Sequence, residues 1–81
     1  MDEYYIGTIQ LFPYKPGTGD WLPCDGSLLR ADDGVSEGLF AVLGNRFGGS
    51  GIVFGLPDLR AASPNDKIKY YILRNWQYPN N

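Results

Sequence analysis

The sequence predicts a small α+β domain that is rich in short antiparallel strands and carries one short helix. Its 81 residues include 11 glycines and 6 prolines, which favour tight turns over long helices. One segment near each end alternates in the manner of a strand, and one short stretch has helical spacing. With 43% apolar residues, the chain is typical of a folded protein, and we expect a single domain over residues 1–81.

The two long strands are expected near the two ends of the chain. In residues 4–12, Ile9 and Leu11 fall on one face at period two, and Gln10 and Phe12 fall on the other. Residues 67–74 alternate in the same way. We expect these two strands to pair with each other.

Residues 13–19 predict an exposed loop, because two prolines and a Gly-Thr-Gly run break the first strand. The loop carries Tyr14 and Lys15. After it, Asp25-Gly26 lies between two short apolar runs, which is a strong hairpin signal. We therefore predict a β-hairpin over residues 21–29. Because Pro23 cannot donate a hydrogen bond, the first arm of the hairpin is either an edge strand or paired only on its other side.

A short helix is predicted over residues 37–43, with Leu39, Phe40 and Leu43 as its inward stripe. Ser36 is expected to cap its N-terminus, and Gly44 to end it in the αL conformation. A Gly-dense loop then spans residues 47–51, and extended chain is expected over residues 52–60 because of Pro57.

Charge and chain-end patterns argue against several classes of protein. The net charge of −2 and the pI near 4.7 lack the basic surface of a nucleic-acid binder. Residues 1–3 are acidic where a signal peptide needs positive charge, and no apolar run reaches a membrane span. We expect no nucleic-acid partner, no membrane insertion and no signal peptide of the usual kind.

The single cysteine and the absence of histidine limit how this chain is stabilised. Cys24 has no partner for an intrachain disulfide, and one thiol without histidine cannot build a tetrahedral zinc site. We predict no cofactor and no metal. Because a domain of this size has a marginal core, association with other subunits is the expected source of further stability.

Several motifs, in order, resemble the phage tail collar domain, which also occurs in bacterial proteins labelled microcystin-dependent. The matching segments are Gly7-Thr8-Ile9 with Leu11-Phe12, Gly19 with Trp21 to Gly26, Leu28-Leu29, Leu39 to Gly44, Phe47 to Gly51, and Phe54 to Arg60. The positions expected to have structural roles are Gly7, Trp21, Cys24, Asp25, Gly26, Gly44, Gly48, Gly49, Pro57, Asp58 and Arg60.

This chain departs from the family pattern at three points. Asp20 is inserted before Trp21, Ser50 stands where the family usually has Asp, and the segment after Arg60 lacks the insert of longer relatives. The resemblance therefore implies a scaffold more securely than it implies receptor recognition.

Each motif also has a chemical alternative. Cys24 is read as a buried thiol beside a turn rather than a nucleophile, since it has no histidine or cation to lower its pKa. The Gly loop is read as a turn rather than an anion cradle. The carboxylates Asp25, Asp32, Asp33 and Asp58 lack the spacing of a calcium loop. Asp58 is expected to pair with Arg60 or to cap.

The aromatic residues are too numerous for so small a core. We expect some of these side chains either to fill a subunit interface or to bind a glycan, and we favour the interface. The candidates are Tyr14, Tyr71, Trp76 and Tyr78.

The function that these features predict is mechanical. The chain is expected to be a non-enzymatic structural subunit of a phage tail, a tail-derived particle or a related extracellular assembly. Its expected partner is itself, as a trimer or a head-to-tail filament, with other tail proteins or cell-surface glycans as further partners. The alternative is a small glycan-binding adhesin or receptor-binding module of tail-fibre type.

Overall fold

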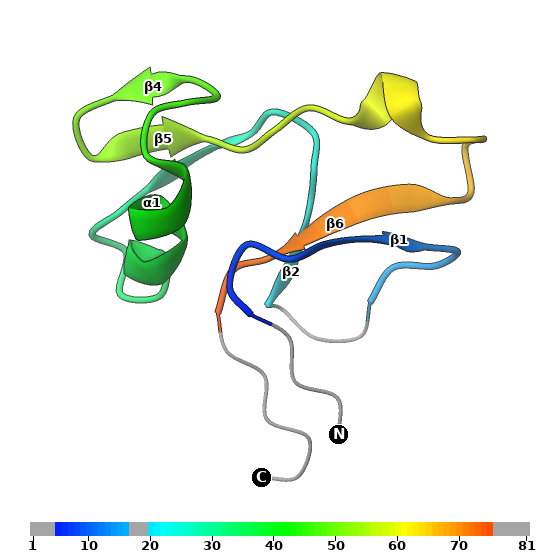
Figure 1. Ribbon diagram of the computed structural model, residues 1–81, viewed down its shortest axis with the longest axis horizontal. Coiled ribbons are helices and arrows are strands. Elements are labelled where there is room, and N and C mark those ends of the chain that lie inside the picture. The colour runs from blue at the N-terminus through cyan, green and yellow to red at the C-terminus, as the bar shows by residue number, and fades with distance from the viewer. Residues whose placement is uncertain (1–4, 17–19, 76–81) are drawn as a thin grey trace, which may run out of the picture.

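The computed structural model describes residues 5–16 and 20–75. In these ranges six short strands form two three-stranded sheets, accompanied by one α-helix and one 3-10 turn, η1 (Arg60–Ala62) (Figure 1). Every strand pair is antiparallel. The predicted α+β, β-rich fold class is therefore confirmed.

The first sheet joins the two ends of the described chain. Its order is β1 (Ile9–Phe12), β6 (Lys69–Leu73) and β2 (Trp21–Pro23), so β6 is the central strand. β1 pairs with β6 along its whole length. The predicted pairing of the terminal strands is thus confirmed.

Both terminal strands are shorter than the sequence pattern indicates, because a turn replaces the start of each. Before β1, the N–H and hydroxyl of Thr8 donate to the Tyr5 carbonyl, and Gly7 has a φ of 93°. Before β6, the side-chain oxygen of Asn65 accepts from the backbone N–H groups of Lys67 and Ile68. These turns use backbone donors that a longer strand would place in the ladder.

The second sheet has the order β3 (Leu28–Arg30), β5 (Val53–Gly55) and β4 (Gly49–Ser50). The extended chain expected around residues 52–60 therefore contains a three-residue strand and then the irregular segment leading to η1. In Figure 1 this sheet lies beside the helix, at the end of the molecule away from β1.

The predicted hairpin over residues 21–29 is wrong. β2 pairs with β6 in the first sheet, whereas β3 pairs with β5 in the second. Pro23 has no N–H to donate, and the next residue, Cys24, donates its N–H to the Tyr70 carbonyl instead. Asp25-Gly26 is thus a corner between two sheets, so the two apolar runs meet different partners.

The helix α1 (Glu37–Leu43) has the predicted bounds, and Leu39 and Leu43 are buried. Two details of its ends differ from the prediction. Ser36 is fully buried and makes no side-chain cap, because its hydroxyl donates to Asp33. Gly44 has a positive φ of 58°, but its ψ of −147° lies outside the αL region.

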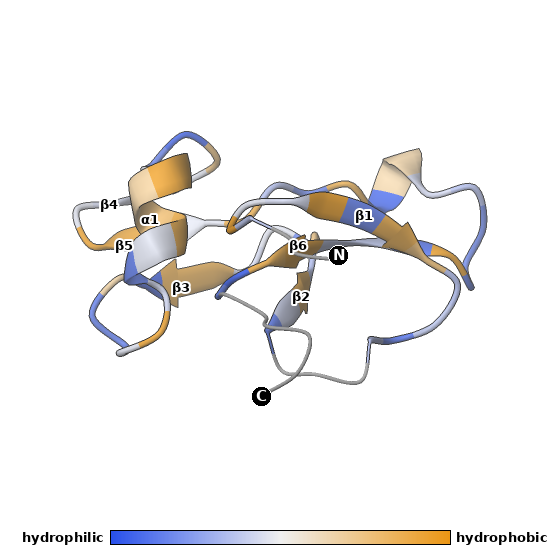
Figure 2. Cartoon of the chain, turned by 60° about the horizontal axis from the view of Figure 1, so that its bottom comes forward, coloured by the Kyte–Doolittle hydropathy of each residue, from blue (hydrophilic) through white to orange (hydrophobic). Residues whose placement is uncertain are grey.

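The core consists of two clusters, and neighbouring residues of β6 belong to each. Ile72 belongs to the larger cluster with Leu39 and Phe54, whereas Leu73 packs in a smaller one with Trp21 and Tyr71. The molecule measures only 34 × 33 × 16 Å, so its flat shape leaves little depth for a core. Figure 2 shows hydrophobic strands in both sheets, among them β3 and most of β1.

Candidate functional site

Two motif segments that are distant in the sequence meet where the two sheets join. Residues 24–27 run antiparallel to residues 56–59: the Leu56 N–H donates to the Ser27 carbonyl at 2.9 Å, and the Leu59 N–H donates to the Cys24 carbonyl at 2.8 Å. We call this pairing the motif junction. Because it uses backbone groups, it fixes how the chain crosses from one sheet to the other.

Asp58 and Arg60 form a two-point ion pair on the surface of the motif junction. Nε and Nη2 of Arg60 donate to the two carboxylate oxygens of Asp58 at 2.9 and 2.8 Å. Hydrogen bonds from Arg60 lower the pKa of Asp58 to about 2. The expected pairing is confirmed. It keeps the Asp58 carboxylate ionised and bound to the Arg60 guanidinium.

Asp25 organises the corner itself. Its Oδ1 accepts hydrogen bonds from the N–H and the hydroxyl of Ser27, and the next residue, Gly26, has a φ of 81°. This is an Asx turn, in which a carboxylate replaces a backbone acceptor. The turn interpretation of Asp25 is confirmed, although the turn does not close a hairpin.

Cys24 is the first residue of the motif junction. Its thiol is free, and only 3% of the residue is exposed. Burial and the adjacent Asp25 raise its pKa to about 11. A thiol of this kind is a poor nucleophile, because thiolate is the reactive form. The expected buried, structural role is supported.

The other two carboxylates considered from the sequence, Asp32 and Asp33, also have partners within the chain. Asp33 accepts from the N–H groups of Val35 and Ser36 and from the Ser36 hydroxyl, which shapes the approach to α1. Asp32 forms a two-point ion pair with Arg30. Residues 5–16 and 20–75 contain no group of three or more potential metal ligands.

The Gly-dense loop is a tight β4–β5 hairpin. A Cβ on Gly49 would lie 2.1 Å from the Val53 carbonyl oxygen, and one on Gly55 would lie 2.7 Å from that of Phe47. Glycine is therefore needed for close backbone approach. The side-chain amide of Asn45, which the sequence pattern did not single out, donates to the Val53 carbonyl at 2.8 Å and holds this hairpin to the end of the helix.

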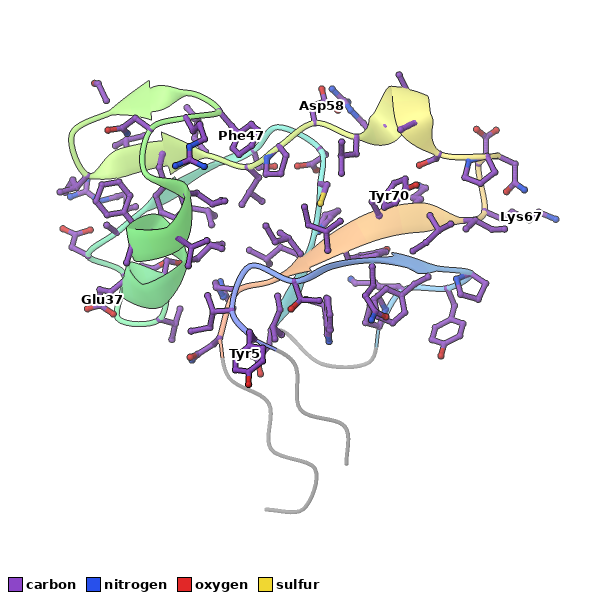
Figure 3. The ribbon with its side chains drawn as sticks, viewed as in Figure 1. Tyr5, Glu37, Phe47, Asp58, Lys67 and Tyr70 are labelled. Carbon is purple, nitrogen blue, oxygen red and sulfur yellow. The ribbon has the colours of Figure 1, made fainter. Side chains whose placement is uncertain are left out.

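A groove of about 550 Å³ opens where β2 leaves the edge of β6. Tyr70 lies between β6 and the segment that carries η1 (Figure 3). Charged and polar side chains surround it, among them Lys15, Arg60 and Lys69. Periodicity placed Tyr70 on a strand face but gave no signal for this groove, which depends on where β2 ends.

A scan against protein-family models matched the Phage Tail Collar Domain over residues 7–64, which is more than half of the chain. The chain belongs to the phage tail collar domain family. The match begins at Gly7 and ends just beyond η1, so it contains both halves of the motif junction. The family is one of structural phage-tail domains, and the match indicates a structural role in a phage tail.

Two other comparisons found no similar protein for this collar domain. Searches among curated proteins and among solved structures found no significant match. Among the described residues, no helix is long and apolar enough to cross a bilayer.

The aromatic residues expected at an interface or on a glycan have different positions in this collar domain. Tyr14 is exposed over 66% of its surface. Tyr71 is only 7% exposed and packs edge-on against Phe12 with the ring centres 5.6 Å apart, so it is a core residue and not an exposed ring. Trp76 and Tyr78 lie outside the described residues.

Large hydrophobic side chains are exposed most densely along one short segment of the collar domain. The described residues of this kind are Tyr5, Ile9, Leu11, Tyr14, Leu28, Val35, Val42, Phe47 and Ile52. Four of these nine come from residues 5–14, which include β1 and the turns beside it. This segment is a candidate contact surface.

Proposed function

We propose that this collar domain is a non-enzymatic building block of a phage tail or a tail-derived particle and that it works by associating with copies of itself. The observation that carries the proposal is the apolar segment 5–14, exposed on a chain whose family is structural. Monomeric proteins rarely expose large apolar patches, and four large hydrophobic side chains are exposed within these ten positions.

The flat shape supports the same proposal. A plate 16 Å thick buries few side chains in its interior, and the described chain has ten buried hydrophobic residues: Trp21, Cys24, Ala31, Leu39, Leu43, Phe54, Leu56, Tyr71, Ile72 and Leu73. Small domains with so limited a core commonly gain stability from partner subunits. The expected assemblies are the trimer that the family resemblance implies and a head-to-tail filament.

The chemistry of the side chains supports a non-enzymatic role. The chain contains no histidine, its thiol is buried with a raised pKa, and Asp58 is held in an ion pair. No nucleophile and general base are brought together among these groups, which is the arrangement that hydrolytic chemistry needs.

Light scattering on the purified protein, followed by negative-stain electron microscopy, tests the proposal. A closed oligomer or a filament is the expected result. A stable monomer at high protein concentration would overturn it.

The groove around Tyr70 favours one second candidate function, binding of a neutral or zwitterionic glycan. An aromatic ring with polar neighbours such as Ser63 and Asn65 is a common arrangement for sugar stacking and hydrogen bonding. Saturable binding on a glycan array, lost in Tyr70→Ala and kept in Tyr5→Ala, would establish this function, and no binding to any glycan would remove it.

A further inference from the structure

β1 is an edge strand that carries no charge and no proline, and among the described residues no strand pairs with its outer side. Residues 5–14 contain no charged side chain, and no proline occurs before Pro13. The other edge, β2, is only three residues long and ends in Pro23. Edge strands in soluble proteins are normally blunted by charge, proline or a cover, because their free backbone groups pair readily with another chain.

The hydrogen-bond pattern of the sheet shows which backbone groups of β1 point outward. The Leu73 N–H donates to the Thr8 carbonyl, whereas the Tyr70 carbonyl accepts from the N–H of Cys24, the residue that follows β2. Along an antiparallel strand, the backbone N–H and C=O groups of successive residues point to opposite sides. The backbone groups of residues 69, 71 and 73 in β6 therefore point toward β1, and those of residues 70 and 72 point toward β2. The register then directs the N–H and C=O groups of Ile9 and Leu11 away from β6.

The side chains of these two residues are also available for contact. Ile9 and Leu11 lie on one face of the sheet, opposite Ile72 and Tyr70, and each is 41% exposed. Figure 2 shows β1 as hydrophobic except for one hydrophilic band, which corresponds to Gln10. Within the described residues, backbone hydrogen bonds connect Ile9–Phe12 to β6 alone.

We propose that β1 pairs antiparallel with β1 of a second copy, about a two-fold axis at Gln10. Ile9 of each copy then bonds to Leu11 of the other through the outward backbone groups, and the two Gln10 side chains face each other. The result is a continuous six-stranded sheet of order β2-β6-β1-β1-β6-β2. This inference rests on the proposed self-association and specifies one of its interfaces.

The neighbouring symmetric registers are less favourable. Centring the axis on Leu11 would place Ile9 opposite Pro13, which has no N–H. Centring it on Ile9 would place Leu11 opposite Gly7, whose N–H already donates to Leu73. The Gln10 register is the one that gives both outward residues a partner with free donor and acceptor groups.

Because residues 5–14 carry no charge, the open edge of β1 suits pairing with a second copy of the same chain. A two-fold interface brings each residue near its own symmetry mate, so any charge close to the axis would meet a like charge. In β1 the residue on the axis is the neutral Gln10, whose amide can both donate and accept a hydrogen bond. Tyr5 and Tyr14, both exposed, flank the strand and extend the contact. Such an interface closes a dimer, and a larger assembly requires a second interface.

A charge-swap experiment tests the interface directly. Gln10→Lys and Gln10→Glu each place like charges on the two-fold axis, so each variant alone should lose the contact and show at most half the wild-type mass in light scattering. An equimolar mixture should regain the wild-type mass, because Lys then faces Glu. Leu28→Lys, a charge on a residue 60% exposed outside β1, should leave the mass unchanged.

A disulfide test remains valid if a charged variant fails to fold. Residues opposite each other in a non-hydrogen-bonded antiparallel pair have Cα atoms about 4.5 Å apart, which suits a disulfide. Gln10→Cys in a Cys24→Ser background should therefore form a covalent dimer on mild oxidation, whereas Leu28→Cys in the same background should not.

The outcomes separate this inference from the proposed function. If the wild type and Gln10→Lys assemble equally well, the β1 interface is overturned and self-association is not. The same conclusion follows if the mixture of Gln10→Lys and Gln10→Glu does not regain the wild-type mass. Gln10→Cys that yields no covalent dimer has the same meaning. A monomeric wild type overturns both.

Discussion

Asp58 and Cys24 show how neighbouring residues determine the state of an ionisable group in this chain. The Asp58 carboxylate is exposed but accepts three hydrogen bonds from Arg60, which lower its pKa. The Cys24 thiol has the opposite shift, because burial disfavours its charged form. Each effect leads to a measurement on a single residue.

The depressed pKa of Asp58 predicts a specific loss of stability in acid. Its folded pKa of about 2 lies below the usual 3.8, so its contribution is present above pH 4 and is lost as the pH falls from about 4 toward 2. Thermal unfolding followed over this range should show a shallower decline for Asp58→Asn than for the wild type. Parallel pH profiles for the two proteins would contradict this role of the ion pair.

Cys24 should react slowly with a thiol reagent in the native protein. Raising a thiol pKa from 9.0 to about 11 reduces the thiolate fraction near pH 8 by roughly 100-fold, before any steric protection. Reaction with Ellman's reagent should therefore be at least that much faster in concentrated urea. Equal rates in buffer and in urea would mean that the thiol is not buried.

At the scale of secondary-structure elements, short-range sequence patterns predicted where the two long strands and the helix lie. Period two located β1 and β6, and helical spacing between Ser36 and Gly44 gave the bounds of α1, although neither residue has the predicted capping geometry. The hairpin prediction failed because Asp25-Gly26 specifies a turn without specifying its partners, and Pro23 removes a donor that a hairpin would use. The pairings that replace it join residues more than 20 positions apart, such as Arg30 with Val53 and Ser27 with Leu56, and no short-range signal contains them.

In the candidate site, too, the local contacts were predictable from the sequence and the long-range ones were not. The Asp58–Arg60 pair is two residues apart, so the sequence alone indicated it. The groove at Tyr70 and the open edge of β1 depend on strand order, which became visible only when β6 was found between β1 and β2. Periodicity alone could not distinguish buried Tyr71 from an exposed ring, because both faces of β6 are covered near its end.

The β4–β5 hairpin gives a matched pair of substitutions. Gly49→Ala would force a Cβ into the Val53 carbonyl at a φ of 80°, whereas Gly51→Ala places its Cβ in open space at a φ of 61°. We expect a loss of about 1 kcal/mol in unfolding free energy for Gly51→Ala, and at least about 2 kcal/mol for Gly49→Ala because the backbone must also shift. Urea denaturation measures both, and equal losses would contradict the close approach at Gly49.

At the scale of the whole molecule, β6 and the motif junction couple the two sheets. Ile72 and Leu73 are adjacent but belong to different core clusters, and the backbone pairing of residues 24–27 with 56–59 spans the gap between the sheets. Loss of one sheet therefore exposes the core of the other.

This coupling predicts a single unfolding transition. In a Trp76→Phe background, the fluorescence of Trp21 reports on the first sheet, and far-ultraviolet circular dichroism reports on α1. Both signals should change at the same urea concentration. Separate midpoints would show that the two sheets unfold independently.

Self-association is the central claim for the whole molecule, since the family match, the flat shape and the exposed segment 5–14 all bear on it. Sedimentation equilibrium of the wild-type protein over a wide concentration range tests it most directly. The account predicts a mass that rises well above that of one 9.0 kDa chain and stays there at high concentration. A single species of 9.0 kDa at every concentration would contradict it.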